Sequence, residues 1–360
     1  MTGSFLLAPF SAVYATAARL RRRWYRLHPE AQRTLRGPVI SVGNIALGGR
    51  RKTPLVAALA RWLVDHGERP AILTRGYGRE HPREGVVVVR DVSGVLAPLA
   101  EAGDEPFMLA QMLEGCAVLV CSDRYAAGRL AETQLGCTVH LLDDGFQHLR
   151  VARQVDLVVV HPQDVTSARV LPSGRLREPL DALDAADAAI WIESPGNEAS
   201  HARQRHDTHA AQFIVRHRLG RPRPLAASPP MVPLAPPARI IAIAAIAEPQ
   251  RFFDDLREAG WDVADVLTFR DHHRFCHEDL EHIGARLHQA AAVAVLTTEK
   301  DGVRLAAPKA HPTESDRMLP FPVAVVPLDV SIDPPEAFFA WLAERVESAR
   351  VAITGQELVR

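Results

Sequence analysis

The sequence predicts an α/β fold, with a doubly wound parallel sheet, a second, smaller α/β lobe and an N-terminal amphipathic helix. Short apolar segments alternate with helical patterns from residue 38 to residue 192, which indicates the sheet. The same alternation restarts near residue 240, after a proline-rich stretch, which indicates the second lobe. Apolar residues at helical spacing before residue 28 predict the N-terminal helix.

Composition limits the class of protein. A chain of 360 residues with 47% hydrophobic residues can bury one large core or two smaller ones. The formal net charge of −1 is not basic, so we expect no nucleic-acid partner. The four cysteines have no metal-ligand spacing and are too few for a disulfide framework, which favours a reducing cytosolic setting. No apolar run of about 20 residues exists, so we expect no spanning helix.

The first predicted helix carries an apolar stripe and an arginine stripe on opposite faces. The apolar stripe consists of Phe10, Val13, Ala17, Leu20 and Trp24. The arginine stripe consists of Arg19, Arg22, Arg23 and Arg26. Such a helix suits the headgroup region of an anionic membrane leaflet. The alternative is a helix packed on its own domain with solvated arginines. A signal peptide is disfavoured, because the positive charge follows the apolar part.

The most informative stretch is the turn after the first strand. The strand at 38–42 leads through a glycine-containing loop to Lys52 and Thr53. A helical pattern follows, with Val56, Leu59, Ala60 and Leu63 on one face, and it closes at Gly67. This order is typical of a P-loop NTPase-like fold. Backbone N–H groups cradle the phosphates, the lysine reaches the β and γ oxygens and the threonine hydroxyl ligates Mg²⁺. The predicted nucleotide-binding residues are Ala46, Leu47, Gly48, Gly49, Arg50, Arg51, Lys52 and Thr53.

Two positions of this loop depart from the usual motif. The pattern G-x-x-x-x-G-K-[ST] has glycine where this chain has Ala46 and Arg51. Taken alone, the segment is therefore equally compatible with a glycine-rich turn before an ordinary helix.

The pattern along the chain divides it into five parts. Further strands are expected at 71–74, 86–90, 117–121, 137–142, 155–160 and 188–192. Between residues 220 and 237 the composition is rich in proline and cannot hold regular structure. We predict a membrane-surface helix over 1–28, a P-loop domain over 29–219, a linker over 220–237, a smaller α/β lobe over 238–345 and a loosely ordered tail over 346–360.

Two pairs of adjacent acidic residues lie at the ends of predicted elements, one at the end of a strand and one at the start of a helix. Asp143 and Asp144 end an apolar strand, where a P-loop enzyme holds Mg²⁺ or its waters opposite the Lys-Thr pair. Asp104 and Glu105 open a helix, where they could serve as helix caps, as a general base or as carboxylates that organise a metal. The predicted metal-organising residues are Thr53, Asp143 and Glu105.

The smaller lobe adds further candidates. In the sequence Asp271-His272-His273, one histidine could pair with a carboxylate of the first lobe and tune it as a base. The stretch from Thr297 to Asp301 follows a strand, but its lysine and aspartate are adjacent instead of in the order [N/T]-K-x-D. A GTPase is therefore disfavoured. Loop arginines that could reach phosphate are Arg75, Arg124 and Arg177.

Together these residues resemble one family, the tetraacyldisaccharide 4'-kinases, which phosphorylate the lipid A precursor of Gram-negative bacteria. The resemblance spans about residues 5 to 330 in the family's order. Its first blocks are the Tyr/Arg-rich first helix, VGN at 42–44 with GG at 48–49 and KTP at 52–54, RGYG at 75–78, GDEP at 103–106 and DR at 123–124. The later blocks are DDGFQH at 143–148, LP at 171–172 with LREP at 176–179, F at 269 with DHH at 271–273, and TEKD at 298–301.

This resemblance implies an ATP- and Mg²⁺-dependent kinase at the cytoplasmic face of the inner membrane, peripheral and without an obligate protein partner. It would phosphorylate the 4'-hydroxyl of a tetraacylated glucosamine disaccharide 1-phosphate, giving lipid IVA. Carried over by position, Asp104 is the base and His272 assists it. Lys52 and Thr53 bind triphosphate and metal, and Asp143 and Asp144 organise the reacting centre. The substrate and phosphate cleft would be lined by Arg75, Arg124, Gln147, His148 and Arg177.

Several glycines of the family pattern are replaced, among them the residue before the P-loop lysine, which is Arg51 here. An arginine at this place could clash with the phosphate-wrapping backbone or could add a phosphate contact. Two alternatives therefore stay open beside an active kinase. One is a catalytically degenerate relative that binds nucleotide or lipid. The other is a soluble P-loop kinase or GTPase for a small molecule, against which the first helix argues.

Overall fold

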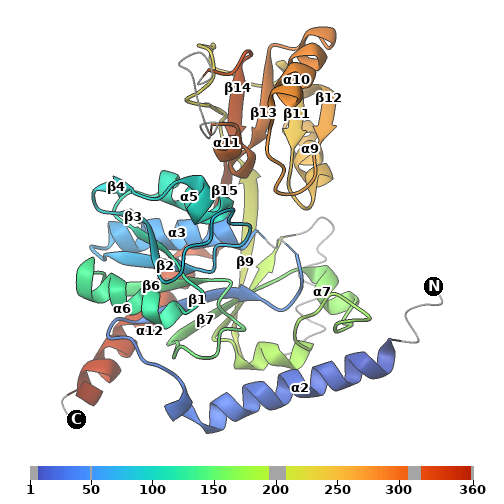
Figure 1. Ribbon diagram of the computed structural model, residues 1–360. Helices are drawn as coiled ribbons and strands as arrows, with labels where there is room; N and C mark the ends of the chain where they lie inside the picture. The colour runs from blue at the N-terminus through green and yellow to red at the C-terminus, as the bar shows by residue number, and fades with distance from the viewer. Residues whose placement is uncertain (1–6, 49–50, 194–207, 307–317, 358–360) are drawn as a thin grey trace.

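The computed structural model describes residues 7–48, 51–193, 208–306 and 318–357. Its larger lobe is built on a ten-stranded sheet of order β15-β9-β8-β7-β1-β6-β2-β5-β3-β4 (Figure 1). The seven strands from β9 to β5 run parallel, as predicted, and antiparallel strands flank them. These strands are β1 Val39–Asn44, β2 Pro70–Thr74, β3 Val87–Asp91, β4 Gly94–Val95, β5 Ala117–Val120, β6 Val139–Asp143, β7 Val155–Val160, β8 Ala188–Ile192, β9 Ala211–Leu219 and β15 Leu328–Asp333.

Helices cover both faces of this sheet, which makes it doubly wound. On one face, α3 (Lys52–Asp65), α5 (Asp104–Met112) and α12 (Pro335–Glu357) enclose the largest apolar cluster. The helical face predicted after the P-loop is confirmed, because Val56, Leu59 and Leu63 of α3 are fully buried there. The other face is covered by α6 (Arg124–Gln134), α2 (Ala8–Leu27) and the short helices α7 (Pro162–Thr166) and η2 (Leu180–Ala185). The remaining short helices are η1 Pro29–Ala31 and α4 Leu99–Ala102.

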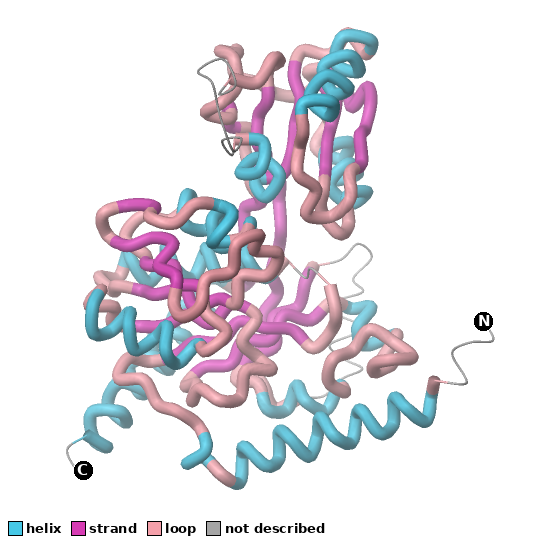
Figure 2. Tube along the Cα trace, in the orientation of Figure 1, coloured by secondary structure: helices cyan, strands magenta, loops and turns pink. Residues whose placement is uncertain are grey.

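The smaller lobe holds a five-stranded sheet of order β10-β14-β13-β11-β12, between α9 and α10. Its elements are β10 Arg223–Pro224, β11 Arg239–Ala244, α9 Pro249–Glu258, β12 Asp262–Thr268, α10 His277–Gln289, β13 Ala294–Thr298, α11 Glu299–Leu305 and β14 Val323–Val326. The neighbouring strands β9 and β15 connect it to the larger lobe, where they pair antiparallel from Ile214 to Leu219 (Figures 1 and 2).

The structure corrects three domain boundaries. The linker predicted over 220–237 contains β10, which pairs with β14 at the edge of the small sheet. The segment after β14 does not belong to the smaller lobe, because β15 returns to the large sheet and α12 packs Phe338 and Leu342 into the larger core. The expectation of a loose tail over 346–360 is wrong as far as Glu357, since α12 continues to that residue.

The first helix lies along the larger lobe and buries Ser11 and Ala15 against it. Arg22 pairs with Glu178 at 2.7 Å and is largely shielded, whereas Arg19, which pairs with Asp181 at 2.6 Å, keeps 52% of its side chain exposed. Arg23 and Arg26 are exposed as well, so the expectation of an exposed arginine stripe is wrong for Arg22 alone. The apolar stripe is left outward, with exposed fractions of 65% for Phe10, 71% for Val13 and 59% for Leu20. In the part of the chain that the structure describes, no helix is long and apolar enough to cross a membrane.

Candidate active site

The phosphate loop connects the end of β1 to the start of α3, as the sequence predicts. The buried Asn44 ends the strand, and its Oδ1 accepts a hydrogen bond from the Lys52 ammonium at 3.0 Å. That ammonium also lies 2.8 Å from a carboxylate oxygen of Asp144. Lys52 is thus held by one amide and one carboxylate at the mouth of the loop, where the lysine of a P-loop reaches phosphate oxygens.

The described part of the loop combines buried and accessible residues. Ala46 is fully buried, and the backbone N–H of Leu47 donates to the Arg175 carbonyl at 2.7 Å. Gly48 adopts a φ of 101°, and Arg51 adopts a left-handed conformation with a φ of 51°. Gly49 and Arg50, two predicted phosphate-binding residues, lie outside the described residues. The side chains of Arg51, Lys52 and Thr53 line the cavity described below.

Asp143 is the last residue of β6 and Asp144 follows it, beside the loop, but their environments differ. Burial, followed by the negative charge of Glu105, raises the pKa of Asp143 to about 7. Burial alone would also raise the pKa of Asp144. Hydrogen bonds and charge from Arg177 and Lys52 outweigh this effect and hold it well below its usual value. Asp144 is therefore held as an anion between Lys52 and Arg177. At Asp143 the positive charges of Lys52 and Arg124 also lower the pKa, but they do not outweigh burial.

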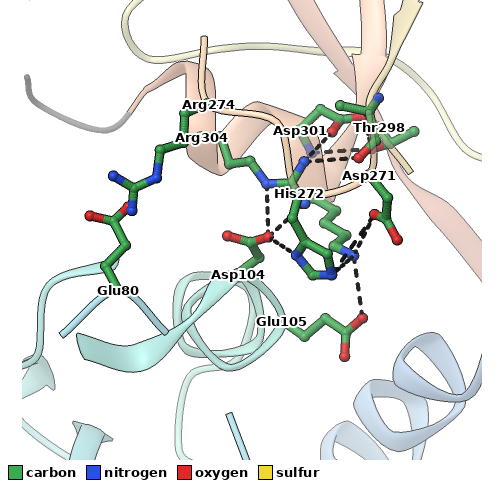
Figure 3. Close-up of polar contacts among 11 residues, drawn as sticks. Glu80, Asp104, Glu105, Asp271, His272, Arg274, Thr298, Asp301 and Arg304 are labelled. Carbon is green, nitrogen blue, oxygen red and sulfur yellow. Dashed lines mark hydrogen bonds and ion pairs between the residues drawn. The ribbon is translucent and has the colours of Figure 1, made fainter. Parts of the chain in front are cut away.

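Asp104 lies at the junction of the two lobes (Figure 3). It starts α5 of the larger lobe, and its Oδ2 lies 2.7 Å from Nδ1 of His272 and 2.8 Å from Nε of Arg304, both from the smaller lobe. Burial alone would raise the pKa of Asp104, but the hydrogen bonds and charges of these two residues lower it below its usual value. The sequence prediction that a histidine of the smaller lobe pairs with a first-lobe carboxylate is met by His272. His273 pairs instead with Asp279 of its own lobe.

Lys300 contacts the other ring nitrogen of His272. Its ammonium lies 3.4 Å from Nε2 of His272 and 3.6 Å from a carboxylate oxygen of Glu105. Both ring nitrogens of His272 therefore have a partner, Asp104 at Nδ1 and Lys300 at Nε2.

A cavity of about 560 Å³ lies between the lobes. Asp104 is not part of its wall, but it contacts His272, which is. The larger lobe contributes the end of the phosphate loop, Glu105 and the strand-end carboxylates, and the smaller lobe contributes His272, Lys300 and residues of α9. Four non-glycine residues in the described ranges have positive φ, and three of them, Arg51, Asp144 and His272, line this cavity. Backbone strain of this kind persists where the surroundings fix it, which is frequent at functional sites.

The predicted substrate residues separate into two groups. Arg75 and the buried Arg124 line the cavity. Arg177 is bound to Asp144 and to Asn44 at its edge. Gln147 and His148 do not contribute to the cavity wall. The amide of Gln147 donates to the Asn44 carbonyl at 2.8 Å, and burial, followed by the charge of Arg124, lowers the pKa of His148 to about 4.

Four further residues contact the predicted site residues and are not among them: Asn44, Asp255, Lys300 and Arg304. Lys300 belongs to a stretch whose chemistry was considered only for guanine binding. Arg304 is nearly buried and is oriented by Asp301, whose carboxylate accepts from it at 2.9 Å. Asn44 precedes the loop as one more strand residue, and Asp255 is one acid among several on a helix. Asn44 and Lys300 lie in the VGN and TEKD blocks, but no local pattern predicts their contacts, because these are made across the loop or across the lobe interface.

The donor set fits Mg²⁺ coordinated partly by nucleotide and water. Among the described residues, no group of three or more His, Cys, Asp or Glu side chains forms a ready metal cage. Mg²⁺ normally takes only one or two protein carboxylates and completes its shell with phosphate and water oxygens. Burial, followed by the negative charge of Glu105 and, to a smaller extent, of Asp144, raises the pKa of Asp143. A divalent cation would relieve this repulsion.

Comparison with known proteins gives one consistent result. The family model described as tetraacyldisaccharide-1-P 4'-kinase matches residues 3–347. The chain is 41% identical over 304 residues to the tetraacyldisaccharide 4'-kinase of Pelobacter propionicus, covering 83% of this chain and 82% of that one. It is 36% identical over 345 residues to the Geobacter sulfurreducens enzyme of the same name, covering 92% and 93%. A solved structure, LpxK from Aquifex aeolicus in complex with ATP, superposes with a TM-score of 0.75 at 28% identity, covering 95% of this chain and 99% of that one.

Proposed function

The chain belongs to the tetraacyldisaccharide 4'-kinase family of lipid A biosynthesis, and from that premise we propose how its residues carry out the transfer. ATP is the phosphoryl donor, and the acceptor is the 4'-hydroxyl of a tetraacylated glucosamine disaccharide 1-phosphate. The observation that carries the proposal is the position of Asp104. This carboxylate is fixed by His272 and Arg304 beside a cavity whose wall includes Lys52 and Thr53.

Asp104 is the proposed base. The 4'-oxygen attacks the γ-phosphorus, the bond from that phosphorus to the β–γ bridging oxygen breaks, and ADP leaves. Phosphoryl transfer passes through a loose transition state, so the hydroxyl proton is lost late and a weakly basic carboxylate suffices. Asp104 accepts that proton, while His272 and Arg304 fix its orientation. The main contribution of the protein is therefore positioning and charge neutralisation.

Lys52 and the Asp143 region form the proposed phosphate and metal side of the site. Lys52 would exchange its contact with Asp144 for phosphate oxygens, and Thr53, Asp143 and Glu105 would hold Mg²⁺. When bound, Mg²⁺ neutralises charge on the β- and γ-phosphates. Arg75 and Arg124 supply further positive charge on the cavity wall, and we assign them to the phosphates or the acceptor.

The test is formation of the product. Purified protein with ATP, Mg²⁺ and the tetraacylated acceptor should give a bisphosphorylated disaccharide lipid, detected by mass spectrometry, together with one ADP per product. ADP release without a phosphorylated lipid would contradict the proposal that the tetraacylated disaccharide is the acceptor. Absence of both products would favour the degenerate, binding-only relative.

We further propose that α2 docks the enzyme on a membrane surface. What supports this is the outward apolar stripe of the helix, beside which Arg19, Arg23 and Arg26 are also exposed. Full burial of a valine or leucine side chain contributes about 1.5–3 kcal/mol. The partly exposed stripe can therefore supply reversible adsorption without a spanning segment.

Replacing Val13 and Leu20 together by Glu should reduce binding to phosphatidylglycerol-containing vesicles by about tenfold or more. Activity on acceptor embedded in vesicles should fall with it, whereas activity on acceptor dispersed in detergent should not. Flotation and product assays measure both. Val92→Glu, at an exposed valine of the β3–β4 turn, is the matched control. Equal vesicle binding of the double variant and the control would exclude α2 as the docking element.

A further inference from the structure

Arg51 occupies an unusual position in the phosphate loop. It directly precedes Lys52, at the N-cap of α3, and it adopts a left-handed conformation with φ of 51° and ψ of 39°. The usual motif has glycine at this place, and glycine enters that region without a steric penalty. A residue with a Cβ keeps this conformation only where its surroundings fix it. The side chain makes no capping hydrogen bond, so the stabilising contact must come from elsewhere.

That contact crosses to the other lobe. The Arg51 guanidinium lies 2.7 Å from a carboxylate oxygen of Asp255 on α9. Both side chains are largely shielded, with exposed fractions of 18% and 27%, so the pair is screened less by salt than an open surface pair. Both residues line the cavity between the lobes.

The neighbouring histidine does not compete for this carboxylate as a cation. His217 on the connecting strand β9 lies near Arg51. Burial, followed by the positive charge of Arg51, lowers the pKa of His217 to about 3. Near pH 7 it is therefore neutral, and Asp255 balances the charge of Arg51.

We propose that Asp255 is a positioning residue for the phosphate loop. By pairing with Arg51 it holds that residue in the left-handed conformation that the loop requires, where glycine would need no partner. The smaller lobe thereby prepares the larger lobe for nucleotide before nucleotide arrives. This inference rests on the proposed function, because it assumes that the loop binds the phosphates of ATP.

A comparison of two single variants with the double variant tests whether Asp255 positions the loop through Arg51. Asp255→Asn leaves a strained Arg51 without its partner, and the affinity for Mg²⁺–ATP should fall about five- to tenfold. Arg51→Gly should bind Mg²⁺–ATP within about twofold of wild type, because glycine holds the loop by itself. The double variant should also bind within about twofold of wild type, so that Arg51→Gly suppresses the defect of Asp255→Asn.

The measurement is isothermal titration calorimetry with ATP and Mg²⁺, together with KM for ATP and kcat. Asp254→Asn is the matched control, since Asp254 is the preceding residue of α9 and pairs with Arg257 away from the loop. Asp255→Glu should retain most of the affinity. The defect of Asp255→Asn should appear in KM for ATP with kcat nearly unchanged. Thermal melting shows whether each variant is folded.

Three results would overturn the inference. If Arg51→Gly weakens binding and the double variant is no better, Arg51 is itself a phosphate ligand. If Asp255→Asn tightens binding, Asp255 competes with phosphate for Arg51. If Asp255→Asn behaves like Asp254→Asn while wild type makes product, the pair has no role in nucleotide binding. Failure of the proposed function would look different, because wild-type protein itself would then form no phosphorylated lipid.

Discussion

Asp104→Asn is expected to lower kcat by about 10²–10⁴-fold, the contribution that general-base catalysis commonly makes. The substitution keeps the shape of the side chain and removes its ability to take the 4'-hydroxyl proton. KM for ATP should change little, because the proposed phosphate ligands lie on the loop and at the end of β6. Steady-state kinetics at saturating acceptor measures both quantities.

The control is Glu101→Gln, since Glu101 is a nearby acid whose carboxylate pairs with Arg83 at 2.9 Å instead of facing His272. It should retain nearly full activity. Retention of more than about a tenth of kcat in Asp104→Asn would assign the base to another group. His272→Ala adds a second readout. Because His272 helps to lower the pKa of Asp104, its removal should move the acid limb of the kcat–pH profile to higher pH.

The loop that we propose to bind phosphate was predictable from sequence because its signals are local. A strand, a glycine-containing turn and a Lys-Thr pair lie within a few residues, and the parallel sheet brings the end of β6 beside them. The burial of Val56, Leu59 and Leu63 followed from helical spacing in the same way. Fold class and nucleotide loop therefore needed no knowledge of distant contacts.

The lobe interface was less predictable, because its contacts join residues far apart in sequence. Arg304 lies 200 positions from Asp104, and Arg51 lies 204 positions from Asp255. Helical spacing separated the arginine stripe of α2 from its apolar stripe, but it did not predict that Ser11 and Ala15 form the buried face. The shielding of Arg22 depends on Glu178, which belongs to a different segment. The return of β15 to the large sheet could not be predicted from the sequence either, because its pairing with β9 depends on tertiary contacts.

Asp143→Asn is expected to make the nucleotide-free protein more stable while reducing kcat by about 10³-fold or more. Folding places the Asp143 carboxylate in a buried site next to Glu105, which raises its pKa from 3.8 to about 7. Between these two pH values the folded state holds a proton that the unfolded state has released. This group therefore makes the protein less stable as pH rises from about 4 to about 7. Asparagine has no charge to desolvate.

Differential scanning fluorimetry without nucleotide, from pH 5 to pH 8, tests this sign. The advantage of Asp143→Asn over wild type should be small near pH 5 and should grow to about 1–3 kcal/mol near pH 8, a few degrees in Tm. Mg²⁺–ATP should then stabilise wild type far more than the variant, since the proposed metal ligand is missing. A variant that melts below wild type at pH 8 without nucleotide would mean that Asp143 makes stabilising contacts as an anion. The negative charge buried at the end of β6 would then serve the fold as well as the metal, and the loss of kcat alone could no longer be assigned to Mg²⁺ binding.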